Sequence, residues 1–113
     1  IGAPLDETVV RGQIEGGILQ GLGLGWGEMM TKVRGKIVHD TLSSYILATA
    51  VDAPPIYHRL LPNPYARGPK GAKGLGELPL VGTAPALISA VNQGSNRVLC
   101  HIPGVPEFLK ELD

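Results

Sequence analysis

Residues 71–79, Gly71-Ala72-Lys73-Gly74-Leu75-Gly76-Glu77-Leu78-Pro79, form a glycine-rich loop at the start of a predicted helix. The three glycines leave the backbone almost bare of side chains, so a ligand can approach the main chain directly. Pro79 and the apolar run after it predict the helix start, which would direct backbone N–H groups towards the loop. Glu77 lies at this junction and is the only acidic residue between Asp52 and Glu107.

Two interpretations of Glu77 follow from the residues alone. A carboxylate on a turn at a helix start is held rigidly, as a general base requires. The same pattern also fits a plain glycine turn, in which a solvated Glu stabilises the N-terminus of the helix. Composition alone favours the second interpretation.

A first helix is predicted to begin after Asp6, whose side chain can cap it. Val10, Ile14, Ile18 and Leu22 then recur at four-residue spacing and form one apolar stripe. A helix at this position therefore has one face suited to burial.

Seven glycines between residues 12 and 27 oppose this helix. At about 1 kcal/mol each relative to Ala, they cost on the order of 7 kcal/mol of helix propensity, so tertiary contacts must compensate. Gly17, Gly21 and Gly25 share one face, where another backbone or a flat ligand can approach closely. A membrane helix is the rival explanation, but the polar residues Glu15, Gln20 and Glu28 interrupt it.

The rest of the chain predicts an α+β fold with two main helices, a few short strands and long Gly/Pro-rich loops. The second helix opens at Thr83 with Pro85 in its first turn, and ends at Asn92-Gln93-Gly94 with Gly94 as a left-handed cap. We expect Cys100 to serve packing. The remaining expected elements are a turn at 33–36, strands at 36–39, 56–61 and 97–102, and a short helix at 106–112.

Composition limits the functions open to the chain. Its 113 residues, with 16 glycines, 10 prolines and few aromatics, allow one domain or a part of one, so residues 1–113 are treated as a single unit. The net charge is zero and no basic run occurs, which argues against nucleic acid or a membrane surface as partner. The single cysteine excludes an internal disulfide and favours a cytoplasmic setting. The three histidines lack metal-ligand spacing, so no protein metal site is expected.

Two long motifs carry a resemblance to a known family. Residues 73–80, followed by Gly82-Thr83-Ala84-Pro85-Ala86, resemble the active-site segment of the xanthine oxidase/aldehyde oxidase family of molybdenum hydroxylases. Residues 12–23, Gly-Gln-Ile-Glu-Gly-Gly-Ile-Leu-Gln-Gly-Leu-Gly, resemble a second family segment, which lies against the molybdopterin cofactor. The likeness covers most of the chain but only the C-terminal end of a much larger molybdenum-binding subunit. The chain is therefore expected to be a C-terminal fragment of a molybdopterin-binding domain.

One intermediate segment departs from the family pattern. Residues 44–50 resemble the family's Asp-Tyr-x-x-Pro-Thr-Ala stretch, with Ser44 in place of Asp and Ala48 in place of Pro. These departures weaken the match of this segment and leave both end motifs intact.

The resemblance implies an oxidative hydroxylation of an aldehyde or N-heterocycle, with water as the oxygen source. It makes Glu77 the general base, Gln13 a hydrogen-bonding contact of the pterin, and Gly74 and Gly76 cofactor-binding positions. From the residues alone, Gln13 also fits an exposed amide near the helix start. The implied cofactor is molybdopterin with molybdenum, its cytosine dinucleotide being one form. Lys70 and Lys73 fit either a role at its phosphates or plain solvation.

The resemblance also implies partners. These are the rest of the molybdenum-binding subunit, iron–sulphur and FAD domains or subunits, and a small-molecule substrate. The alternative is a non-catalytic fragment or accessory module that keeps the fold and binds no metal. Without its partners, the fragment is expected to hold no cofactor, to turn over no substrate, and to self-associate through its exposed apolar stripe.

Overall fold

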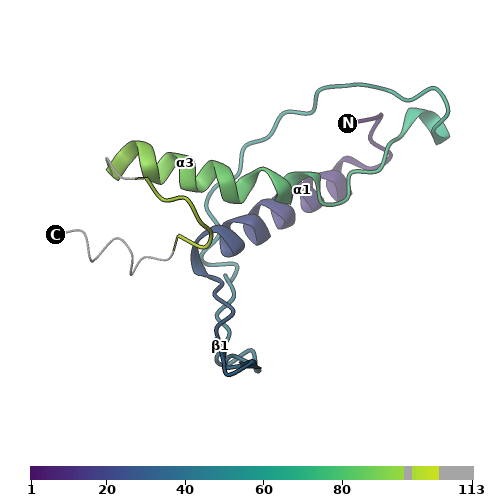
Figure 1. The fold of residues 1–113 in the computed structure, drawn as a ribbon. Coiled ribbons are helices and arrows are strands. Elements are labelled where there is room, and N and C mark those ends of the chain that lie inside the picture. The colour runs from purple at the N-terminus through teal and green to yellow at the C-terminus, as the bar shows by residue number, and fades with distance from the viewer. Residues whose placement is uncertain (96–97, 105–113) are drawn as a thin grey trace.

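The computed structural model describes residues 1–95 and 98–104. Two helical segments lie side by side, an arm projects from one end of them, and a long loop returns along the other side (Figure 1). This arrangement of helices with a two-stranded sheet confirms the predicted α+β class. In chain order the elements are α1 (Glu7–Leu22), the π-helical turn η1 (Gly23–Gly27), β1 (Lys32–Val33), β2 (Lys36–Ile37), the 3₁₀ turn η2 (Pro69–Gly71), α2 (Leu78–Val81) and α3 (Thr83–Ser95).

Helix α1 begins where its capping residue predicts. The Asp6 carboxylate accepts hydrogen bonds from the backbone N–H groups of Thr8 at 2.8 Å and Val9 at 3.1 Å, which satisfies two of the unpaired donors of the first turn. At its other end, α1 continues into η1, where the Glu28 N–H donates to the Gly23 carbonyl five residues earlier, at 2.8 Å. The last turn of the helix therefore contains one residue more than an α-helical turn.

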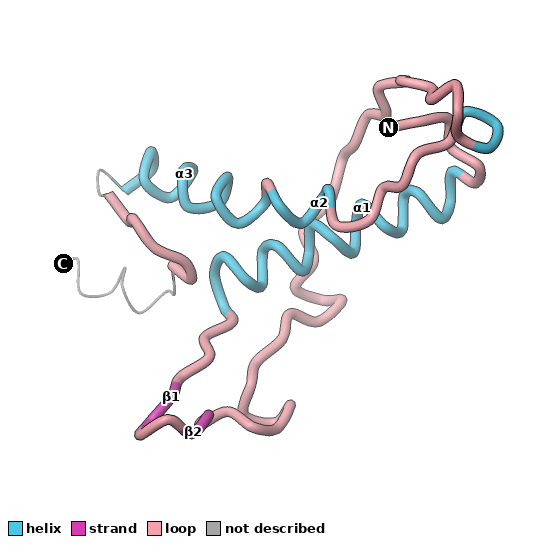
Figure 2. Tube along the Cα trace, turned by 45° about the vertical axis from the view of Figure 1, so that its right-hand side comes forward, coloured by secondary structure: helices cyan, strands magenta, loops and turns pink. Residues whose placement is uncertain are grey.

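The glycine face of α1 and η1 is filled by backbone and Cβ atoms of the second helical segment, α2–α3. A Cβ atom on Gly17 would lie 3.0 Å from the Cβ of Pro79, and one on Gly21 would lie 2.6 Å from the Cβ of Thr83. A Cβ on Gly25 would lie 3.1 Å from the Cα of Ala84. The contacts advance in step along both segments, so α1 and α2–α3 run in the same direction (Figure 2). This face is predicted to accept either another backbone or a flat ligand. In the structure the second helical segment occupies it.

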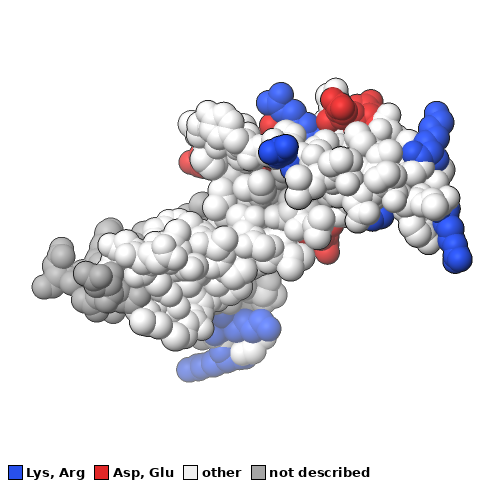
Figure 3. All heavy atoms as spheres, turned by 90° about the horizontal axis from the view of Figure 1, so that it is seen from above, with Lys and Arg blue, Asp and Glu red and all other residues white. Residues whose placement is uncertain are grey.

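Few side chains are buried. Among the described residues, the buried apolar side chains are Ile14 of α1 and Ala84 and Ile88 of α3. The radius of gyration is 17.4 Å, against about 13 Å for a compact domain of this length. Figure 3 shows broad uncharged surface between the charged side chains, and α3 itself carries no charged residue. Much apolar surface is therefore left uncovered by this chain.

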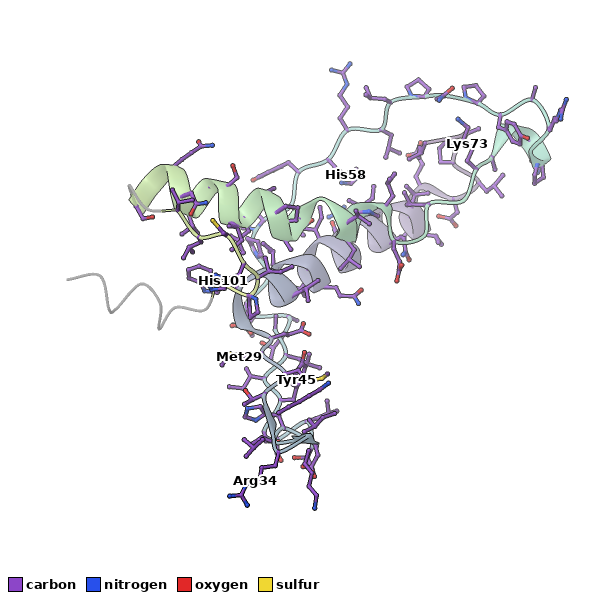
Figure 4. The ribbon with its side chains drawn as sticks, in the orientation of Figure 1. Met29, Arg34, Tyr45, His58, Lys73 and His101 are labelled. Atoms are coloured by element: carbon purple, nitrogen blue, oxygen red, sulfur yellow. The ribbon has the colours of Figure 1, made fainter. Side chains whose placement is uncertain are left out.

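The arm, residues 28–49, ends in a small antiparallel hairpin. Arg34 and Gly35 form its two-residue turn with φ of 49° and 81°, the left-handed pair that matches the twist of a hairpin. The turn predicted at 33–36 is confirmed, whereas the strand predicted at 36–39 is limited to β2. The Tyr45 hydroxyl, labelled in Figure 4, donates to the Glu28 carboxylate at 2.8 Å. This bond joins the returning half of the arm to the end of η1.

Tyr45→Phe is expected to lower the free energy of opening the arm by about 1 kcal/mol, the usual net value of one hydrogen bond. The arm should therefore open more often. The Glu28 carboxylate raises the pKa of Tyr45, because the phenol can donate only while protonated. The stabilisation is therefore complete below the ordinary pKa of ~10 and is lost as the pH rises through the raised pKa. Hydrogen exchange of arm peptides in the intact subunit measures the opening. Tyr57→Phe is the control, since Tyr57 is 93% exposed, and equal exchange in both variants would show that the Tyr45 bond does not hold the arm.

The strand predicted at 56–61 is wrong. These residues are part of a strap, residues 53–65, that carries no assigned strand. Within 56–61 the backbone hydrogen bond to another segment is the one from the Ile1 amino group to the Leu61 carbonyl, at 3.2 Å, and the Asn63 N–H donates to the Ile1 carbonyl at 2.8 Å just beyond it. A strand requires a ladder of such bonds, and contacts with a single residue do not make one.

The strand predicted at 97–102 is also wrong for residues 98–102, and residue 97 lies outside the described residues. The Asn92 side chain takes the place of a strand partner here, since it accepts from the Leu99 N–H at 2.7 Å and donates to the Leu99 carbonyl at 3.1 Å. Cys100 is exposed, so its predicted packing role is wrong.

The predicted end of the second helix is wrong as well. Helix α3 continues through Gly94 to Ser95, and Gly94 does not have a positive φ. Glycine accepts the right-handed helical conformation at modest cost, so its presence alone does not end a helix. The helix predicted at 106–112 lies outside the described residues.

Candidate functional site

The upstream end of the 71–77 loop is held by the N-terminal segment. The Gly71 carbonyl accepts hydrogen bonds from the Ala3 N–H at 2.9 Å and the Tyr65 N–H at 3.0 Å. Gly71 itself has φ of 79°, a conformation that favours glycine. Gly2 is buried against the loop, and a Cβ there would overlap the Lys73 backbone nitrogen. No local sequence pattern indicates the role of Gly2, because its contact is with a segment far along the chain.

The downstream end of the loop is held by α2. The Glu77 carbonyl accepts from the Leu80 N–H at 2.9 Å and the Val81 N–H at 3.3 Å, so Glu77 begins the first turn. The Thr83 hydroxyl donates to the Pro79 carbonyl at 2.7 Å and joins α2 to the start of α3. The helix predicted after Pro79 is present, although α2 is only four residues long.

Gln13 joins the two motifs. Its side-chain Nε2 donates to the Gly76 carbonyl at 2.8 Å, across 63 residues of sequence. Gly76 has φ of 51°, which turns the chain directly before Glu77. The structure thus brings together Gln13, Gly76 and Glu77, three of the four predicted site residues.

The open side of the loop carries the fourth, Gly74. A Cβ on Gly74 or Gly76 would meet no atom of this chain within 4 Å, so the backbone there is accessible. Glu77 is exposed at the same place, and the neighbouring Leu78 is 66% exposed. The described residues therefore do not enclose the Glu77 carboxylate in apolar surroundings.

A groove of about 520 Å³ runs beside this loop. Leu75 and Leu78 lie on one wall, Ile14 and Ile18 of α1 on another, and His58 of the strap on the third. Figure 4 labels His58 on the strap and Lys73 on the loop. Lys73 and Lys70 are exposed, and neither forms an ion pair with the described residues. The groove is mainly apolar, and its lining includes Leu78, the sequence neighbour of Glu77.

Two further properties bear on the site. Within residues 1–95 and 98–104, no group of three His, Cys, Asp or Glu side chains could hold a metal ion. No helix in the same part of the chain is long and apolar enough to cross a membrane.

Known proteins resemble this chain in sequence and in fold. The profile of the molybdopterin cofactor-binding domain family matches residues 1–54. The carbon monoxide dehydrogenase large chain of Hydrogenophaga pseudoflava is 36% identical over 93 residues, which are 80% of this chain and 11% of that protein. The nicotine 6-hydroxylase large subunit of Paenarthrobacter nicotinovorans is 32% identical over 110 residues, which are 94% of this chain and 14% of that protein.

The fold is shared as well. The crystal structure of quinoline 2-oxidoreductase from Pseudomonas putida 86 matches with a TM-score of 0.85 and 32% identity, over 98% of this chain and 15% of that one. The chain thus spans 11–15% of the length of these relatives. It belongs to the molybdopterin-binding subunits of the xanthine oxidase/aldehyde oxidase family of molybdenum hydroxylases, and corresponds to a part of such a subunit.

Proposed function

We propose that this chain supplies the general base and cofactor contacts of a molybdenum hydroxylase acting on an N-heterocycle or an aldehyde. The observation that carries the proposal is the Gln13–Gly76 hydrogen bond, which places the cofactor motif beside the loop that ends in Glu77. Two relatives are named for N-heterocyclic compounds, nicotine and quinoline, which supports the first substrate class.

The residues fit a bound molybdopterin. Gly74 and Gly76 present backbone free of side chains on the open face of the loop, so a flat ring system or a phosphate can approach the main chain. Gln13 uses one amide hydrogen for Gly76 and retains its oxygen as an acceptor for an N–H of the pterin. When bound, the cofactor would supply the molybdenum that accepts the electrons of the oxidation.

Glu77 acts as the proton acceptor in this proposal. Its carboxylate takes up the proton that water releases when its oxygen is added to the substrate carbon, and returns that proton to solvent afterwards. The start of α2 holds the Glu77 backbone, so the Cα atom that carries the carboxylate is already in place before the reaction. The apolar groove beside the loop suits the ring of an aromatic substrate.

The intact enzyme would need further partners. The rest of the large subunit would cover the exposed face of Glu77, and iron–sulphur and FAD centres elsewhere would carry the electrons away. The cytosine dinucleotide is the proposed form of the cofactor, with Lys70 and Lys73 near its phosphates. The single cysteine is in keeping with a cytoplasmic location.

Metal analysis of the purified intact complex tests the proposal. We expect close to one molybdenum per large subunit and substrate-dependent reduction of an electron acceptor, both lost when the complex is produced without molybdate. A complex that folds and assembles normally but holds no molybdenum would instead show that the chain is part of a non-catalytic module.

A further inference from the structure

We infer that Gln13 is a positioning residue for Glu77, a role distinct from any contact it makes with the cofactor. The inference rests on the proposed function of Glu77 as the base. Its starting point is the 2.8 Å bond from Gln13 Nε2 to the Gly76 carbonyl. That carbonyl belongs to the same peptide unit as the Glu77 N–H. Because the peptide unit is planar, holding its oxygen also holds the Cα atom that carries the Glu77 side chain.

Between Lys73 and Glu77 the loop has few other hydrogen bonds. Within the described residues, the other hydrogen bonds to residues 73–77 come from Leu78, Leu80 and Val81, which belong to α2. Residues 73–76 contain two glycines, and the positive φ of Gly76 is readily exchanged for other conformations. Gln13 is therefore the one described group outside the loop and α2 that hydrogen-bonds to this stretch.

Helix α1 is a suitable support for this contact. Gln13 lies on a capped helix, one turn before Gly17, which is packed against Pro79 at the start of α2. Gln13 thus holds Gly76 before Glu77, and Gly17 packs against Pro79 after it, so both flanks of Glu77 in the sequence contact the same helix. A shift of the loop relative to α1 would move the carboxylate, and misplacement of a reacting group by about 1 Å can cost ~10²-fold in rate.

A matched pair of substitutions in the intact subunit separates positioning from cofactor binding. Gln13→Met keeps the length and helix propensity of the side chain but cannot donate, whereas Gln13→Lys keeps an N–H donor. We expect Gln13→Met to lower kcat per bound molybdenum about ten- to hundredfold with KM little changed, and Gln13→Lys to restore part of the loss. Gln20→Met is the control, because Gln20 is exposed on the same helix and its side chain forms no hydrogen bond within the described residues.

Hydrogen exchange gives a readout independent of turnover. Peptides that cover residues 74–80 should exchange faster in Gln13→Met than in Gln20→Met. In a Glu77→Gln background, Gln13→Met should lower kcat no further, because it acts through Glu77. Normal exchange at 74–80 together with normal kcat would overturn the inference, and so would loss of molybdenum with normal exchange, which would make Gln13 a cofactor contact alone. Normal turnover of Glu77→Gln would instead overturn the proposed function, while the exchange comparison would still test the Gln13–Gly76 contact.

Discussion

Glu77→Gln in the intact molybdenum subunit is expected to lower turnover by at least ~10²-fold, the low end of the contribution of a general base. The substitution keeps the size of the side chain and removes its ability to take up a proton. Glu77 is exposed and its side chain does not cap α2, so folding of this segment should not change. Molybdenum content should therefore equal that of the unaltered enzyme.

Steady-state turnover, together with metal analysis of the same preparations, checks this expectation. Glu7→Gln is the control, since Glu7 is also an exposed carboxylate in the first turn of a helix and is not one of the proposed site residues. Near-normal turnover of Glu77→Gln with a loaded cofactor would remove Glu77 from the mechanism. Equal losses in both variants would attribute the effect to charge rather than to position.

Gly21→Ala should weaken the contact between α1 and α3 by about 1–3 kcal/mol, the usual cost of overpacking. The added Cβ would lie 2.6 Å from the Cβ of Thr83 and 3.0 Å from the Leu80 carbonyl oxygen. Neither atom is the end of a flexible side chain, so the second helical segment must move away. That movement would also displace the loop before α2, and we expect lower turnover for this reason.

Gly16→Ala is the matched control for this helix. A Cβ on Gly16 would meet no atom outside its own helix within 4 Å, so the substitution should be neutral or stabilise by about 0.5–1 kcal/mol through helix propensity. Both substitutions gain the same helix propensity, so the difference between their effects on stability is the steric cost at Gly21. Hydrogen exchange of α3 peptides in the intact subunit measures this difference. Similar exchange in the two variants would contradict the close approach at Gly21.

Local sequence was sufficient for the elements whose hydrogen bonds close within a few residues. The Asp6 cap, the turn around Gly35 and the helix start at Pro79 each depend on neighbours two to four positions away. The same holds for the apolar spacing of α1, of which Ile14 is buried as the stripe predicts. The motifs around Gln13 and Glu77 were equally visible, because they are contiguous.

The three-dimensional arrangement was needed wherever a residue depends on a distant partner. Residues 56–61 and the described part, 98–102, of the strand predicted at 97–102 have no strand beside them in the part of the chain that the structure describes, and propensity cannot supply one. The glycine face of α1 fitted a ligand or a backbone equally well until α2 and α3 were seen to occupy it. The contact between Gln13 and Gly76 spans 63 residues, and only the packing of α1 against α2 brings those two groups within hydrogen-bonding distance.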